Sequence, residues 1–165
     1  MDASIAALLA QDGITNGAVY ALLALALVLV FAVTRVIWVP SGEFVAYGTL
    51  TLAGLQLGKA TGIAGMLAAM AVLAGAMEVA DAIRRREARH LARSLALWAG
   101  APLAIAGLIH YVAPLQPPFL VQILLTLTAV TALGPLFYRV AYQPIAEASV
   151  LVLLIVSVAL HFALL

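Results

Sequence analysis

The chain has 165 residues, of which 66% are hydrophobic and only 9% are charged, and its formal net charge is +1. Soluble domains are typically about 45–50% apolar and about 25% charged, so this composition indicates a membrane protein. A nucleic-acid partner would need a clustered basic face, which the few scattered charges do not supply. The absence of cysteine excludes disulfides, thiolate nucleophiles and cysteine-ligated metals.

The apolar stretches are continuous and rich in leucine and alanine, whereas the strands of a membrane barrel alternate in polarity. Each unpaired backbone amide in hydrocarbon costs several kcal/mol, so the spanning segments are expected to be helices. We therefore predict an all-α fold, a polytopic transmembrane bundle of about six hydrophobic helices. The expected spans lie near 13–33, 43–57, 63–80, 95–111, 119–137 and 148–165.

The first two spans are separated by a compact set of signals. The first span stops at Arg35, and Trp38 stands where an interfacial aromatic belt is expected. Ser41 is a good helix cap, and Glu43 in the following turn suits the helix dipole. These residues predict a break followed by a new helix, and the proline-rich stretch 114–118 predicts a second break.

The last segment begins near Ala148 and is still apolar at Leu165. A crossing of the hydrocarbon needs about 20 residues, which this segment barely supplies. We therefore expect residues 1–165 to be the amino-terminal part of a single transmembrane domain, truncated at its carboxyl end.

The basic residues predict an orientation, because lysine and arginine are retained on the cytoplasmic side. If all six segments cross, seven basic residues lie on one side and Lys59 alone lies on the other, which places the amino terminus outside. The seven are Arg35, Arg84, Arg85, Arg86, Arg89, Arg93 and Arg139. If the second segment were re-entrant and did not cross the membrane, the predicted orientation of the chain before it would be reversed.

The end of the third span carries Glu78 and Asp81 shortly before the arginine-rich connection. Asp81 precedes Arg84 by three residues and Arg85 by four, a spacing that allows ion pairs within one helix. One interpretation is a solvated helix end that sets the topology. The other is that Arg84, Arg85, Arg86 and Arg89 contact a cytoplasmic partner.

Catalytic and metal sites have no support in the sequence. No phosphate-cradling glycine loop followed by Gly-Lys-Ser/Thr is present, so nucleotide hydrolysis is not encoded. The histidines His90, His110 and His161 show no ligand spacing. We therefore expect no enzyme activity, no catalytic residue, no metal and no cofactor.

The first span carries polar and small residues that a purely lipid-facing helix would not select. Asn16 and Tyr20 share one face, and either bond a neighbouring helix or contact a polar solute. Gly13, Gly17 and Ala21 repeat every four residues, which suits either ordinary bundle packing or a moving or subunit-facing interface.

Ionisable residues inside a membrane are costly unless they are paired, so they are candidates for function. Glu43 either serves its helix dipole or, with Ser41, takes part in a transport path. His161 lies four residues after Ser157 and could bond it as a buried neutral side chain.

Two separated motifs carry a resemblance to a known family. The first runs from Asp12-Gly-Ile-Thr-Asn-Gly-Ala-Val-Tyr through the following apolar run to Arg35-Val36 and Ser41-Gly-Glu-Phe44, and the second is Tyr138-Arg-Val-Ala-Tyr-Gln-Pro144. Together they resemble the opening of branched-chain amino acid ABC transporter permeases of the LivH type. The chain departs from the family at Trp38-Val-Pro-Ser41, where the family has Asn-Phe-Ala-His, and at Gln143, where it has arginine. The region between the motifs is also longer.

The resemblance implies an alternating-access importer in the bacterial inner membrane, with two permease subunits, two cytoplasmic ATPase subunits and a periplasmic solute-binding protein. The solute would be a branched-chain amino acid or a similar small polar molecule, and the pathway candidates are Asn16, Tyr20, Ser41 and Glu43. The ATPase-docking helix would lie in the missing carboxyl-terminal part. An ion-coupled secondary transporter or a non-transporting membrane assembly subunit are the alternatives.

Overall fold

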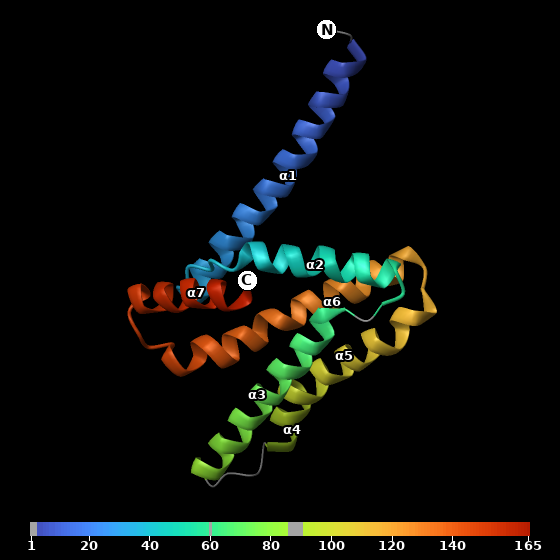
Figure 1. Cartoon of the computed structure of the whole chain (residues 1–165). Coiled ribbons are helices and arrows are strands. Elements are labelled where there is room, and N and C mark those ends of the chain that lie inside the picture. The colour runs from blue at the N-terminus through green and yellow to red at the C-terminus, as the bar shows by residue number, and fades with distance from the viewer. Residues whose placement is uncertain (1–2, 60, 86–90) are drawn as a thin grey trace.

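The computed structural model describes residues 3–59, 61–85 and 91–165, and this part of the chain is helical with no strand. The predicted all-α class is therefore confirmed. The α-helices are α1 (Ala3–Thr34), α2 (Ser41–Gln56), α3 (Gly62–Arg85), α4 (Leu91–Leu95), α5 (Ala101–Val112), α6 (Phe119–Phe137) and α7 (Val150–Leu164). Figure 1 shows their arrangement.

Within the described residues, four helical runs are long and apolar enough to cross a membrane, which indicates a multi-pass membrane protein. They are Ala3–Thr34, Gly62–Arg84, Leu91–Leu115 and Phe119–Ile145. The other two predicted spans are shorter. α2 has 16 residues and α7 has 15, and at 1.5 Å per residue they extend only about 24 Å and about 22 Å against about 30 Å of hydrocarbon.

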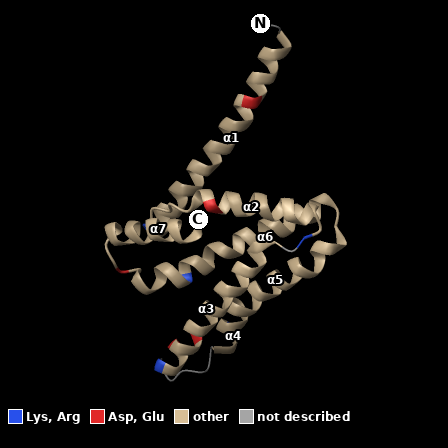
Figure 2. Ribbon diagram, in the orientation of Figure 1, with Lys and Arg blue, Asp and Glu red and all other residues tan. Residues whose placement is uncertain are grey.

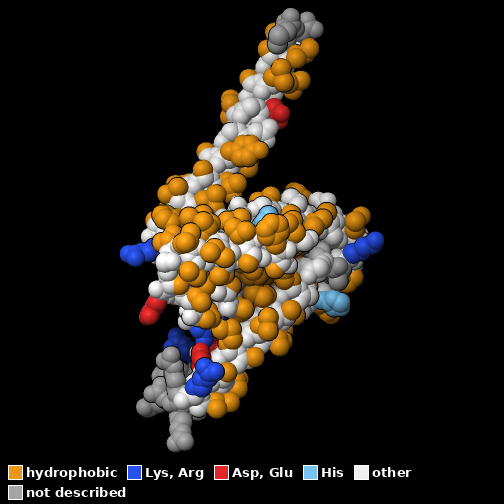
Figure 3. Space-filling view, turned by 60° about the vertical axis from the view of Figure 1, so that its left-hand side comes forward, with side chains coloured by type: hydrophobic (Ala, Val, Ile, Leu, Met, Phe, Trp, Pro, Cys, Tyr) orange, Lys and Arg blue, Asp and Glu red, His pale blue; other side chains and the backbone are white. Residues whose placement is uncertain are grey.

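α1 projects away from the other helices and buries none of its residues in the chain (Figure 1). It begins ten residues earlier than the predicted first span, because the polar residues near its start do not interrupt the helix. Thr15, for example, donates its hydroxyl to the carbonyl of Gln11 at 2.9 Å. Figure 3 shows hydrophobic side chains along α1, a surface suited to lipid or to another protein.

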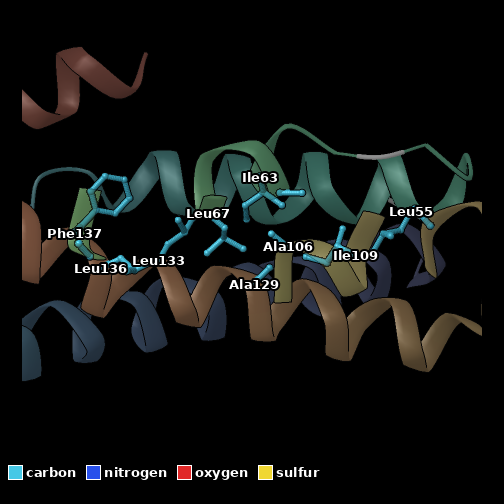
Figure 4. Close-up of a cluster of buried hydrophobic side chains, with 12 residues drawn as sticks. Leu55, Ile63, Leu67, Ala106, Ile109, Ala129, Leu133, Leu136 and Phe137 are labelled. Carbon is cyan, nitrogen blue, oxygen red and sulfur yellow. The ribbon is translucent and has the colours of Figure 1, made fainter. Parts of the chain in front are cut away.

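α2, α3, α5 and α6 share one core, shown in Figure 4, in which Leu55 of α2, Leu67 of α3, Ile109 of α5 and Leu133 of α6 are fully buried. α3 and α5 are close neighbours, and alanines line the buried face of α3. Small side chains let helix backbones approach closely, which matters in lipid because burial there gives little hydrophobic gain. The glycines of α1 pack on no described helix, since a Cβ at Gly13 or Gly17 would meet nothing.

Two π-helical turns, at Ala96–Gly100 and Tyr138–Tyr142, are each followed by a proline after one intervening residue. The ring of Pro102 would clash with the carbonyl four residues earlier in a regular helix. Instead, the residue before it, Ala101, donates to the carbonyl of Ala96, five residues back. The same widened turn precedes Pro144. The wide turns therefore accommodate both prolines, and in the first case the helix continues as α5.

The helix ends gather at two poles of the core. At one pole the α1–α2 break contacts the end of α6, since Trp38 lies 6.5 Å from Phe137 between ring centres, and Arg139 reaches the end of α3. At the other pole Gly58 lies beside Gln116. The charged residues are few and lie mostly near helix ends (Figure 2).

Candidate functional site

A large open hollow of about 1110 Å³ lies between the carboxyl-terminal half of α1, one face of α2 and one face of α6. Its lining is almost wholly apolar. Hydroxyl-bearing residues interrupt this lining at a few places, namely Thr34, Ser41, Thr49, Thr126, Thr131, Tyr138 and Tyr142. The hollow can therefore accept an apolar group and offer it a small number of hydrogen-bond partners.

The break between α1 and α2 forms one end of this hollow and is a defined structure. Arg35 adopts a positive φ of 57°, and its N–H donates to Phe31 at 2.8 Å, which closes α1. Thr34 donates its hydroxyl to Val30 at 2.7 Å and accepts the N–H of Val36 at 3.2 Å. The break therefore holds the two helices at a fixed turn.

Ser41 is the first residue of α2, and Pro40 occupies the cap position without any side-chain cap bond. The predicted capping role of Ser41 is therefore wrong. Proline is tolerated at the start of a helix because the backbone N–H groups there have no carbonyl of an earlier turn to bond. The hydroxyl of Ser41 is left to line the hollow.

Trp38 packs within the chain in an aromatic cluster. Its ring centre lies 5.3 Å from that of Phe44 in an edge-to-face arrangement and 5.8 Å from that of Tyr142. Such offset contacts stabilise aromatic pairs beyond their buried area. The cluster fixes the break against the end of α6, so Trp38 has a packing role that the expected interfacial position does not include.

Glu43, in the first turn of α2, is only 8% exposed. Its Oε1 lies 2.5 Å from Nδ1 of His161 on α7, and its Oε2 is buried without a hydrogen-bond partner. The predicted bond between His161 and Ser157 is wrong, because Ser157 is fully buried and its Oγ accepts the N–H of Val39 at 2.9 Å. Both intramembrane ionisable candidates therefore meet each other.

A second buried charge cluster surrounds Arg139, which is 8% exposed. Its guanidinium contacts Glu78 and lies 3.4 Å from Asp81, both on α3. The same guanidinium stands over the Trp98 ring at 5.9 Å from the ring centre, a cation–π contact. The predicted pairing of Asp81 with Arg84 within α3 is not observed, because both carboxylates turn toward Arg139 on the neighbouring helix.

The predicted pathway residues do not come together. Ser41 lines the hollow, whereas Glu43 faces α7 on another side of α2. Asn16 and Tyr20 are exposed on the projecting part of α1, where Tyr20 is 71% exposed, and they do not line the hollow.

The predicted contact arginines are only partly described. Arg84 borders a smaller polar pocket of about 440 Å³ together with Asp81, Arg139 and Gln143. Arg85 ends α3, and Arg86 and Arg89 lie outside the described residues. A partner contact by this group stays a prediction.

The sequence reading missed the face of α6 that lines the hollow. Thr126, Val130 and Gly134 recur every four residues and lie on this face with Thr131. A stripe of small and hydroxyl side chains in an otherwise apolar helix is the signal that could have identified it.

No protein-family model, curated protein or solved structure matches this chain. The part of the chain that the structure describes has no group of three or more histidine, aspartate or glutamate side chains placed to hold a metal ion. The function is therefore argued from the residues of the chain itself.

Proposed function

We propose that this chain is a transmembrane permease subunit of an ABC importer for branched-chain amino acids or similar small polar solutes, and that it forms part of the translocation pathway. The observation that carries the proposal is the hollow beside the α1–α2 break. Of the two sequence motifs that resemble LivH-type permeases, the first runs along α1 to the start of α2 and the second lies at the end of α6. The α1–α2 break, where the chain departs from the family at Trp38, contacts the second motif through Tyr142.

The chemistry of the hollow suits such a solute. A branched-chain amino acid has an apolar side chain, which the lining of α1, α2 and α6 can accept, and polar main-chain groups, which need hydrogen-bond partners. Ser41, Thr49, Thr126 and Thr131 offer hydroxyl groups for that purpose. The open side of the hollow would be closed by a second permease subunit, as expected for half of a pathway.

The rest of the proposed importer follows from the same resemblance. The sequence has no phosphate-binding loop, so the energy would come from separate cytoplasmic ATPase subunits, with a periplasmic solute-binding protein delivering the solute. The proposed location is the bacterial inner membrane. No covalent chemistry on the solute is required.

A filled-pathway variant tests the proposal. Gly48 lines the hollow, and a Cβ at this position would meet only Val130 at an ordinary 3.7 Å, so Gly48→Leu should insert its side chain into the hollow. Gly65→Leu is the matched control, because a Cβ at exposed Gly65 would meet nothing and this residue does not line the hollow. Uptake of radiolabelled leucine, isoleucine and valine should fall to background in the first variant only. Equal uptake by both variants at equal membrane abundance would contradict the proposal.

The Glu43–His161 pair favours a second candidate, an ion-coupled secondary transporter, since buried ionisable pairs serve proton relays in such proteins. Uptake that continues without any ATPase would support this candidate. A chain whose deletion changes the uptake of no solute would be a membrane assembly subunit.

A further inference from the structure

α7 is attached to α2 by a ladder of three polar contacts. Val39 donates its N–H to Ser157 at 2.9 Å, Glu43 meets His161 at 2.5 Å, and Tyr47 donates its hydroxyl to the carbonyl of Leu164 at 2.7 Å. Residue numbers increase in the same direction along both segments, because the two hydrogen-bonded partners are 118 residues apart in sequence in the first bond and 117 apart in the other. α2 and α7 therefore run parallel, with the acid–histidine pair in the middle of the ladder.

The ladder is a large share of what holds α7. Only Leu153 and Ser157 of this helix are buried, and lipid competes well for the other apolar side chains. Ser157 and His161 are also the only polar side chains among Val150–Leu164. A change in the middle contact should therefore change how often α7 lies against α2.

The Glu43–His161 pair has no net charge when it holds one proton. An imidazolium beside a carboxylate is neutral overall, and at an Nδ1–Oε1 separation of 2.5 Å the two side chains form an ion pair when the imidazole is protonated. Loss of that proton to water leaves one negative charge on a carboxylate that is 8% exposed and whose Oε2 has no partner. An uncompensated buried charge is strongly unfavourable. The side chain of His161 is 31% exposed, and its Nδ1, which faces Glu43, is buried.

Other titratable groups nearby are not placed to replace this pair. Tyr47 on α2 already donates to Leu164, and Tyr142, from the π-helical turn after α6, packs with Leu153 in a small cluster. Arg139, the charged residue of that turn, points to Glu78 and Asp81 on α3. Within the described residues, the charge balance at this contact is therefore set by Glu43 and His161.

We infer that Glu43 and His161 form a proton-binding site, and that its occupancy decides whether α7 is docked on α2. With one proton bound, the pair is neutral and α7 is docked. When the proton leaves, the buried negative charge disfavours the contact and α7 separates from α2. The inference does not rest on the proposed transport function.

The absence of native cysteine allows a direct distance measurement. Spin labels on cysteines at Leu50 of α2 and Ile155 of α7, both well exposed, report the separation of the two helices. In lipid nanodiscs, a single short distance is expected at about pH 5, and a longer population should grow as the pH is raised to about 8. One unchanged distance distribution across this range would overturn the inference.

Three variants test whether Glu43 and His161 cause the pH dependence of this distance. Glu43→Gln removes the acid and His161→Lys supplies a permanent positive charge over this range, so each should abolish the pH dependence. Ser157→Ala is the control, because it removes the first contact of the ladder without a titratable group and should leave the pH dependence in place. A distance that still responds to pH in both pair variants would also overturn the inference. The titration of the labelled parent chain decides the matter if a pair variant fails to insert.

Discussion

The guanidinium of Arg139 lies 5.9 Å from the centre of the Trp98 ring, so the two π-helical turns of the chain meet at this contact. The same guanidinium forms ion pairs with both Glu78 and Asp81 of α3, so one positive charge faces two carboxylates. One side chain therefore joins three helical runs that are long enough to cross a membrane. Isolated charges are costly in such a setting, and this arrangement avoids them.

Replacement of Arg139 should be strongly destabilising. Arg139→Gln leaves the Glu78 carboxylate, whose side chain is 12% exposed, without its charged partner. Breaking a buried ion pair in this way costs about 3–5 kcal/mol. Denaturant or thermal unfolding in detergent measures the loss. Arg84→Gln is the control, since Arg84 is exposed and forms no ion pair with another described residue. An equal loss in both variants would argue against the cluster.

Ser157 should contribute more to stability than its small size indicates. Ser157→Ala leaves the N–H of Val39 without its acceptor in a part-buried position, and an unsatisfied buried donor costs about 1–3 kcal/mol. Hydrogen exchange should then be faster at Val39 and along α7. Thr128→Ala serves as comparison, because its exposed hydroxyl bonds only the carbonyl of Leu124 in its own helix. Unchanged protection at Val39 in Ser157→Ala would contradict the ladder between α2 and α7.

Gly58 is required by the backbone after α2. Its φ is +66°, and a Cβ there would meet Gln116 Nε2 at 3.1 Å. Gly58→Ala should therefore lower the free energy of unfolding by about 1 kcal/mol or more. Gly62→Ala, where a Cβ meets nothing within 4 Å, should be neutral or slightly stabilising. If thermal unfolding ranks the two variants in the opposite order, the described turn is wrong.

The class of fold was predictable because it depends on composition alone. Continuous apolar runs leave no choice but helix in a membrane, and the proline-rich stretch 114–118 separates α5 from α6 as expected. The break at Pro40 was also found from local signals. Helix ends were less predictable. α1 begins at Ala3 and α3 continues to Arg85, because polar residues at a membrane surface do not end a helix.

The partners of the charged side chains could not be predicted from spacing. Asp81 stands at a suitable distance from Arg84 along the chain, yet its partner is Arg139, 58 residues away. Glu43 and His161 were each identified as candidates, but their contact depends on α7 returning beside α2. Such pairings follow from the tertiary arrangement. The lining of the hollow depends in the same way on α6 lying beside α1 and α2, from which it is distant in sequence.

The proposed permease role is tested most directly by solute uptake in cells that carry the gene for this chain, with its partner ATPases present or deleted. Uptake of radiolabelled leucine, isoleucine and valine should require both the permease gene and the ATPases, and catalytically inactive ATPases should abolish it. Uptake that depends on the permease gene but persists without any ATPase would contradict the account and would favour ion coupling instead.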